Sequence, residues 1–168
     1  MSTTVGGTLA PTAIWDPLRT IHGGCDRVPA ACVIEHDTEQ RHAMLTDIAN
    51  HIANAGGIVI AARQGDRHDL GYPSLPEHEA LAQAFEWMPT ATHDEPVVLV
   101  LPTLEYPLPE TRRLLAKLET WRHAYAIVGS NTFLDLNAHH RDWSPLRFPL
   151  VWEDGDLHGT VGNQVNAA

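Results

Sequence analysis

The chain has no hydrophobic run of the roughly 18 to 20 residues that a membrane-spanning helix needs. Its N-terminus also lacks the basic region and apolar core of a secretory signal. Only two cysteines are present, Cys25 and Cys32, and they do not form a CxxC pair. We therefore expect no disulfide framework and no membrane contact, with Cys32 as a buried thiol inside an apolar run. These absences favour a cytoplasmic protein.

Positive charge is also scarce. Eleven Lys and Arg residues stand against 21 Asp and Glu residues, so the formal net charge is −10 at pH 7. Direct nucleic-acid binding needs a basic surface, and this balance argues against it. An acidic chain could instead inhibit a DNA-binding protein by imitating DNA, and that alternative stays open.

The 168 residues, of which 43% are hydrophobic and 19% charged, suit a single globular fold. We expect a flexible N-terminal arm over residues 1–27, where the apolar patch around Trp15 is the part able to pack. A single α/β domain should follow over residues 28–162. Residues 163–168 should form a polar tail.

Apolar strands alternate with amphipathic helices from residue 28 onward. The expected strands are 28–34, 58–62, 96–101, 125–128 and 148–152, the last turning into a hairpin at residues 154–155. The helices between them are expected to begin at N-cap Asp37, at a Ser74–Glu77 capping box and at Pro107 or Pro109. This alternation predicts a three-layer α/β/α sandwich with a mainly parallel sheet, of RecA-like or similar doubly wound topology.

The first strand leads into a turn where nucleotide-binding proteins of this class place a Gly-rich loop. Here the turn reads Glu35-His36-Asp37-Thr38-Glu39-Gln40, with no glycine and three carboxylates. Glycines let backbone amides curl around phosphates, and a lysine neutralises their charge. Two unit charges about 4 Å apart interact by roughly 4 kcal/mol at a surface-like dielectric. The three carboxylates would therefore repel a polyphosphate.

The segment from Glu77 to Leu136 resembles the FtsK/TraB-type DNA translocases, which are RecA-like P-loop ATPases. The resemblance rests on the order of four stretches: 84–88, 97–101, 112–118 and 121–131. In that family the comparable region carries the Walker B strand, a helix, an arginine-bearing turn and a strand ending in a polar sensor residue. The resemblance implies a RecA-like fold and, extended back to Val28, covers most of the chain.

The catalytic residues of that family are missing here. The Walker A pattern, laid on the turn, meets Glu35, Gln40, Arg41 and His42, and only Arg41 keeps the charge of its counterpart. The Walker B strand ends in Pro102-Thr103 in place of carboxylates. The resemblance thus implies a degenerate ATPase domain that needs no cofactor. We favour a non-catalytic accessory or regulatory module with a protein partner, such as an intact ATPase of the same fold; the oligomeric state is left open.

Ligands of open parallel sheets bind beyond the carboxyl ends of the strands. The candidate residues at those ends, called here the strand-end site, are Glu35, His36, Asp37, Arg41, Arg63, Gln64, Thr103, Glu105, Ser130 and Asn131. A small hydrolase or transferase could use such residues, with a carboxylate as general base and Arg63 holding an anion. A divalent metal could assist it, although the histidines are scattered and form no HExxH motif. The competing explanation is that these residues are polar because loops are solvated.

One loop has the composition of a partner contact. Trp143 is flanked by Arg141 and Arg147 in a polar segment where a tryptophan is hard to bury. Tryptophan and arginine are enriched at the energetic centres of protein interfaces. We expect this loop to contact the partner.

Overall fold

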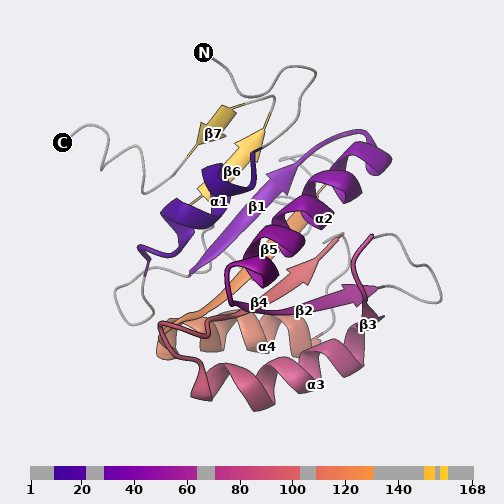
Figure 1. Cartoon of the computed structure of the whole chain (residues 1–168). Helices are drawn as coiled ribbons and strands as arrows, with labels where there is room; N and C mark the ends of the chain where they lie inside the picture. Colours follow the sequence, from indigo (N-terminus) through magenta and orange to yellow (C-terminus); the bar gives the residue numbers. More distant parts are fainter. Residues whose placement is uncertain are drawn as a thin grey trace.

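A computed structural model describes residues 10–21, 29–63, 71–102, 109–130 and 150–153, together with the backbone of residues 156–158. Seven strands form one sheet in the order β3-β2-β4-β5-β1-β6-β7 (Figure 1). The strands are β1 (Ala30–Ile34), β2 (Ile58–Arg63), β3 (Leu75–Pro76), β4 (Val97–Leu101), β5 (Ala124–Ser130), β6 (Leu150–Glu153) and β7 (Asp156–His158). The helices are α1 (Pro11–Leu18), α2 (Thr38–Asn54), α3 (Glu77–Trp87) and α4 (Pro109–Lys117), with 3-10 turns η2 (Met88–Thr90) and η3 (Leu118–Thr120).

The helices cover both faces of the sheet. Helices α1 and α2 lie on one face and α3 and α4 on the other (Figure 1). Alternate residues of each central strand enter the two cores: Ala31 and Val33 face α1 and α2, whereas Cys32 and Ile34 belong to the core with α3 and α4. Burial on both faces explains why these strands are apolar at nearly every position. The predicted three-layer sandwich is confirmed.

All strand pairs are parallel except β6–β7, which is an antiparallel hairpin with Glu153 opposite Asp156. When the short edge strands β3 and β7 are left aside, the first strand lies between the fourth and the fifth. This order differs from the flavodoxin-like order 2-1-3-4-5 and from the Rossmann order 3-2-1-4-5-6. It places the ends of β1, β5 and β4 side by side, and these ends build the site described below.

The N-terminal region differs from the expected flexible arm. Residues 11–18 form α1, a helix with Pro11 at its first position and Pro17 in its last turn. Ile14, Trp15 and Leu18 are buried against α2 and the sheet, and the Trp15 ring meets the Tyr125 ring edge-on at 5.4 Å. The patch around Trp15 does pack, and the packing makes this helix part of the domain. Residues 1–9 lie outside the described part of the chain.

The expected start of α2 is confirmed. Asp37 is its N-cap, and the carboxylate accepts a hydrogen bond from the Gln40 amide at 2.9 Å. After the helix, Gly56 has a φ of 97°, a left-handed conformation that glycine adopts without strain. The apolar face of α2 then packs on the sheet through Leu45, Ile48 and their neighbours.

The expected capping box of α3 is wrong. The helix begins at Glu77 with Pro76 as its N-cap and no side-chain cap, because Leu75 and Pro76 form strand β3 beside the end of β2. The Glu77 carboxylate instead accepts a hydrogen bond from the Thr111 hydroxyl at 2.9 Å, which joins α3 to α4. Leu75 and Pro76 pair with the end of β2, and this pairing gives their backbone groups hydrogen-bond partners in the sheet. The residues before Glu77 are therefore held in a strand, although their sequence favours the start of a helix.

Candidate functional site

The turn after β1 satisfies two of its own backbone amides with its own carboxylates. The Asp37 amide donates to Glu35 Oε2 at 3.0 Å, and the Gln40 amide donates to Asp37 Oδ1 at 2.9 Å. The Glu35 amide bonds the carbonyl of Ser130 at the end of β5, at 3.1 Å. A phosphate bound at such a turn would use these same amides as donors. Here side chains of the turn already occupy the amides of Asp37 and Gln40, and the Ser130 carbonyl occupies that of Glu35.

Arg41 sits in the first turn of α2 and is 98% buried, with 2% of its surface exposed. Its guanidinium donates from Nη1 to the Glu35 carbonyl at 2.8 Å and from Nε to the Pro102 carbonyl at 3.3 Å. Glu35 follows β1 and Pro102 follows β4, and β5 lies between those strands. One side chain therefore links two strand ends across the end of a third.

Gly129 in β5 makes this crossing possible. A Cβ atom built on Gly129 would overlap the Pro102 carbonyl oxygen and would lie 3.1 Å from Cδ of Arg41 and 3.0 Å from Cδ1 of Leu45. The Pro102 oxygen is backbone and cannot swing aside as a side chain would. The strand end, the arginine and the Pro102 carbonyl are thus packed without spare room.

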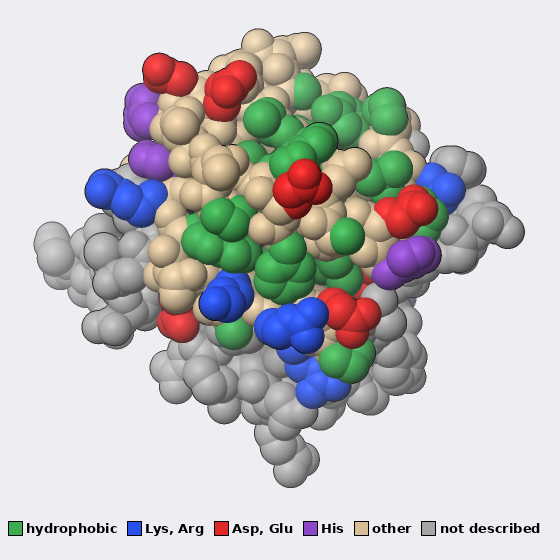
Figure 2. Space-filling view, turned by 90° about the horizontal axis from the view of Figure 1, so that it is seen from below, with side chains coloured by type: hydrophobic (Ala, Val, Ile, Leu, Met, Phe, Trp, Pro, Cys, Tyr) green, Lys and Arg blue, Asp and Glu red, His purple; other side chains and the backbone are tan. Residues whose placement is uncertain are grey.

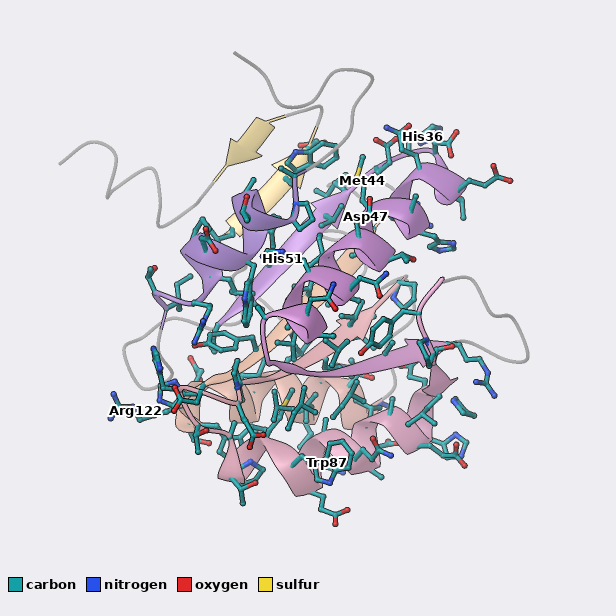
Figure 3. The ribbon with its side chains drawn as sticks, in the orientation of Figure 1. His36, Met44, Asp47, His51, Trp87 and Arg122 are labelled. Carbon is teal, nitrogen blue, oxygen red and sulfur yellow. The ribbon has the colours of Figure 1, made fainter. Side chains whose placement is uncertain are left out.

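The structure places the predicted residues in two groups. Glu35, His36 and Asp37 form the turn, with His36 and Asp37 exposed, and Arg41 and Ser130 lie buried beneath it. Figure 3 shows His36 at the upper right, next to the start of α2. This group is contiguous through the hydrogen bonds given above.

Arg63 does not join that group. It ends β2, which is separated from β1 by β4 and β5, so three strand spacings of about 4.8 Å put roughly 14 Å between the two strand ends. Its guanidinium Nη1 donates to the carbonyl of Ser74, beside β3. Gln64, Thr103, Glu105 and Asn131 lie outside the described residues, as do the partner-loop residues Arg141, Trp143 and Arg147.

Neither thiol chemistry nor metal binding is supported by the residues described at this end of the sheet. Cys32 is fully buried in β1, and burial raises the pKa of its thiol well above the usual range, with the Glu153 carboxylate adding to the rise. A thiol held neutral in the core is a poor nucleophile. In the part of the chain that the structure describes, no three His, Cys, Asp or Glu side chains come together in a way that could hold a metal ion.

Sequence reasoning identified Arg41 as a candidate but missed both its burial and the role of Gly129. Signals for both were present. Arg41 precedes Met44, Leu45 and Ile48 at the spacing of the buried face of α2. A lone glycine inside an apolar strand, as at Gly129, indicates a close approach of another part of the backbone.

The self-capped turn gives a first prediction. We expect Asp37→Ala to lower the free energy of unfolding by about 1 kcal/mol, because the Gln40 amide loses its acceptor at the N-terminus of α2. Asp37→Asn retains a capping oxygen and should stay within about 0.5 kcal/mol of the parent chain. Urea unfolding followed by circular dichroism measures both variants, and equal losses in the two would show that the cap does not stabilise the helix.

Comparisons with known proteins found solved structures that resemble this chain, and one of them is a structure of the cytoplasmic domain of EssC. The chain is similar to it at 16% identity with a TM-score of 0.45. The match covers 74% of this chain and 31% of that one, so this chain spans about a third of its length. No family model matches the chain, and neither does any curated protein. Among the described residues, none of the helices combines the length and apolar character that a membrane span requires.

Proposed function

We propose that the chain is a non-catalytic, P-loop-like binding module that acts through a protein partner and without nucleotide. The observation that supports this most strongly is the occupied turn after β1. Two amides that would hold a phosphate are bonded to Glu35 and Asp37, so a nucleotide would have to displace two charge-assisted hydrogen bonds. It would then lie against the displaced carboxylates, each opposing it by roughly 4 kcal/mol at about 4 Å.

Arg41, the cation at this position, does not compensate for the repulsion between these carboxylates and a phosphate. A lysine or arginine stabilises a bound phosphate only when its charged group can reach the ligand. The Arg41 guanidinium is buried and bonded to the carbonyls of Glu35 and Pro102. Drawing it toward a phosphate would leave both carbonyls without that donor, which costs about 1 to 3 kcal/mol for each buried group.

The accessory role follows from keeping the fold while filling the nucleotide position. We propose that the partner is a protein, such as an intact ATPase of the same fold, and that the loop with Arg141, Trp143 and Arg147 contacts it. Tryptophan and arginine close together in the sequence are suited to that role because both are over-represented among residues that dominate binding energy.

Thermal unfolding with and without ATP and Mg²⁺ tests the nucleotide part of this proposal. A nucleotide present at 100 times its Kd would stabilise the fold by about 2.7 kcal/mol and raise the Tm by several degrees. We expect no shift at about 5 mM ATP, a concentration that would reveal any Kd up to about 50 μM. An intact P-loop ATPase in the same plate serves as the positive control, and a Tm rise of several degrees in this chain would refute the proposal.

Affinity capture tests the partner. With the chain as bait, we expect a bound protein whose recovery is unchanged by ATP or EDTA and is lost with Trp143→Ala. Exposed Trp87, on α3, gives the matched control, since Trp87→Ala likewise replaces a tryptophan by alanine but should leave the capture intact. Capture that requires ATP, or that survives Trp143→Ala, would contradict the proposed contact.

A further inference from the structure

Helices α3 and α4 present an outer surface with an aromatic cluster and charges of opposite sign. Phe85 and Trp121 are half-buried and meet edge-on with ring centroids 6.1 Å apart. The Arg113 guanidinium lies 5.4 Å from the centre of the Phe85 ring. In Figure 2 hydrophobic side chains gather across the middle of this face, and Lys and Arg lie together toward its lower edge. Arginine held on an aromatic ring is already ordered for binding.

The charges are divided between the two helices. The exposed charged residues of α3 are acidic, Glu79 and Glu86, whereas those of α4 are basic, Arg113 and Lys117. The helices run in the same direction, because Glu77 bonds Thr111 near their starts and Phe85 meets Trp121 just beyond the end of α4. The exposed side chains of α3 and those of α4 therefore carry opposite charges and would attract one another.

We propose that this α3/α4 face binds the same face of a second copy of the chain, as a two-fold symmetric dimer. A two-fold axis parallel to the helices lays α3 of one protomer over α4 of its partner, at the same height. Glu77 and Thr111 lie at the same height along the helices, because their side chains are hydrogen-bonded. Glu79 and Arg113 each lie two residues further along their helices, so Glu79 of one protomer stands level with Arg113 of the partner subunit. Glu86 lies about 4.5 Å, or three residues, beyond the level of the partner subunit's Lys117, within reach of that side chain.

The same symmetry brings the apolar groups together. Phe85 lies near the end of α3 and Trp121 follows η3, and their rings are in contact, so the rotation sets both rings of one protomer against both rings of the other. Exposed Ala82 on α3 and Ala116 on α4 leave space for close approach between them. The resulting surface has an apolar centre with charged pairs toward its rim, the composition of a specific interface.

The size of the face sets the expected affinity. Glu77–Thr90 spans roughly 20 Å along the helix axis, and two helices packed side by side are about 20 Å wide. The face therefore covers roughly 400 Å² on each protomer, about 800 Å² in total, which is smaller than a standard specific interface and suits a weak, reversible contact. We therefore expect a reversible dimer with a Kd on the order of 10 μM. The inference is independent of the proposed function, because it concerns a face made by other helices than the strand-end site.

Charge reversal on the full chain tests the dimer. Sedimentation velocity over about 1 to 500 μM should show a monomer–dimer equilibrium. Glu79→Arg alone and Arg113→Glu alone should each weaken it at least about tenfold, because each sets like charges opposite one another twice in the symmetric dimer. An equimolar mixture of the two variants should recover a heterodimer, since both pairs then join opposite charges.

Asp47→Arg supplies the matched control, because it makes the same charge change at an exposed position of α2, on the opposite layer. It should leave the dimer constant within about twofold, and circular dichroism should show all variants folded. A monomer at every concentration would overturn the proposal. So would a dimer unaffected by Glu79→Arg, which would use another face, or a mixture of the two variants that remains monomeric.

Discussion

Replacing Arg41 with alanine is expected to lower the free energy of unfolding by about 3 kcal/mol, although Arg41 contacts no ligand in this account. The change removes a charged donor from two carbonyls, those of Glu35 and Pro102, in a site where water is excluded. Hydrogen bonds to charged groups contribute about 1.5 to 3 kcal/mol each. The cavity left by the side chain adds to the loss. Equilibrium unfolding in urea measures the effect.

Two further variants separate this cause from a simple change of net charge. Arg122→Ala makes the same charge change at an exposed position and should cost less than about 0.5 kcal/mol. Arg41→Lys keeps the charge but loses the planar fork that reaches both carbonyls, so it should cost about half as much as the alanine variant. If Arg41→Ala proved as mild as Arg122→Ala, the linkage of the strand ends would be unimportant.

Gly129→Ala should destabilise the fold by about 3 kcal/mol through the opposite effect, overpacking. The new methyl group would overlap the Pro102 carbonyl oxygen, and the strand end would have to move. Gly71→Ala is the matched control, because its added Cβ would meet only the side chain of Thr46, whose methyl group would lie 3.1 Å away, at an exposed position. We expect the control to lose less than about 1 kcal/mol.

The two substitutions should also be coupled. Gly129→Ala displaces the Pro102 carbonyl that Arg41 bonds, so part of the stabilisation by Arg41 is already lost in that variant. In a double-mutant cycle, the combined loss should therefore fall short of the sum by about 1 kcal/mol. Strict additivity would mean that the two residues act separately.

Much of the sheet and of its covering helices could be predicted, because the apolar residues of each strand and helix recur at the spacing typical of that kind of element. Val97–Leu101 is buried at every position, as its continuous apolar run indicates. The start of α2 at Asp37 could also be predicted, since capping depends on residues close in sequence. Helix α1 was missed because its short apolar patch lies among Gly, Thr and Pro, and its stability comes from burial of Trp15 rather than from propensity.

The site was only partly predictable for a related reason. The sequence shows carboxylates in the turn where a phosphate-binding loop has glycines. This composition alone predicts only that the turn repels phosphate. The bonds from the Asp37 and Gln40 amides back to carboxylates of the same turn depend on backbone geometry. The placement of Arg63 beside Ser74, far from Glu35, depends on strand order, which a single sequence does not encode in its local periodicity.

We propose that the chain's own side chains fill the position where a nucleotide phosphate would bind. The most direct measurement is a ¹H–¹⁵N NMR titration with ATP and Mg²⁺ that follows the backbone amides of Asp37 and Gln40. We expect both resonances to stay in place up to millimolar nucleotide, because their hydrogen bonds are already made. Saturable shifts of these two amides, with a micromolar midpoint, would contradict the account.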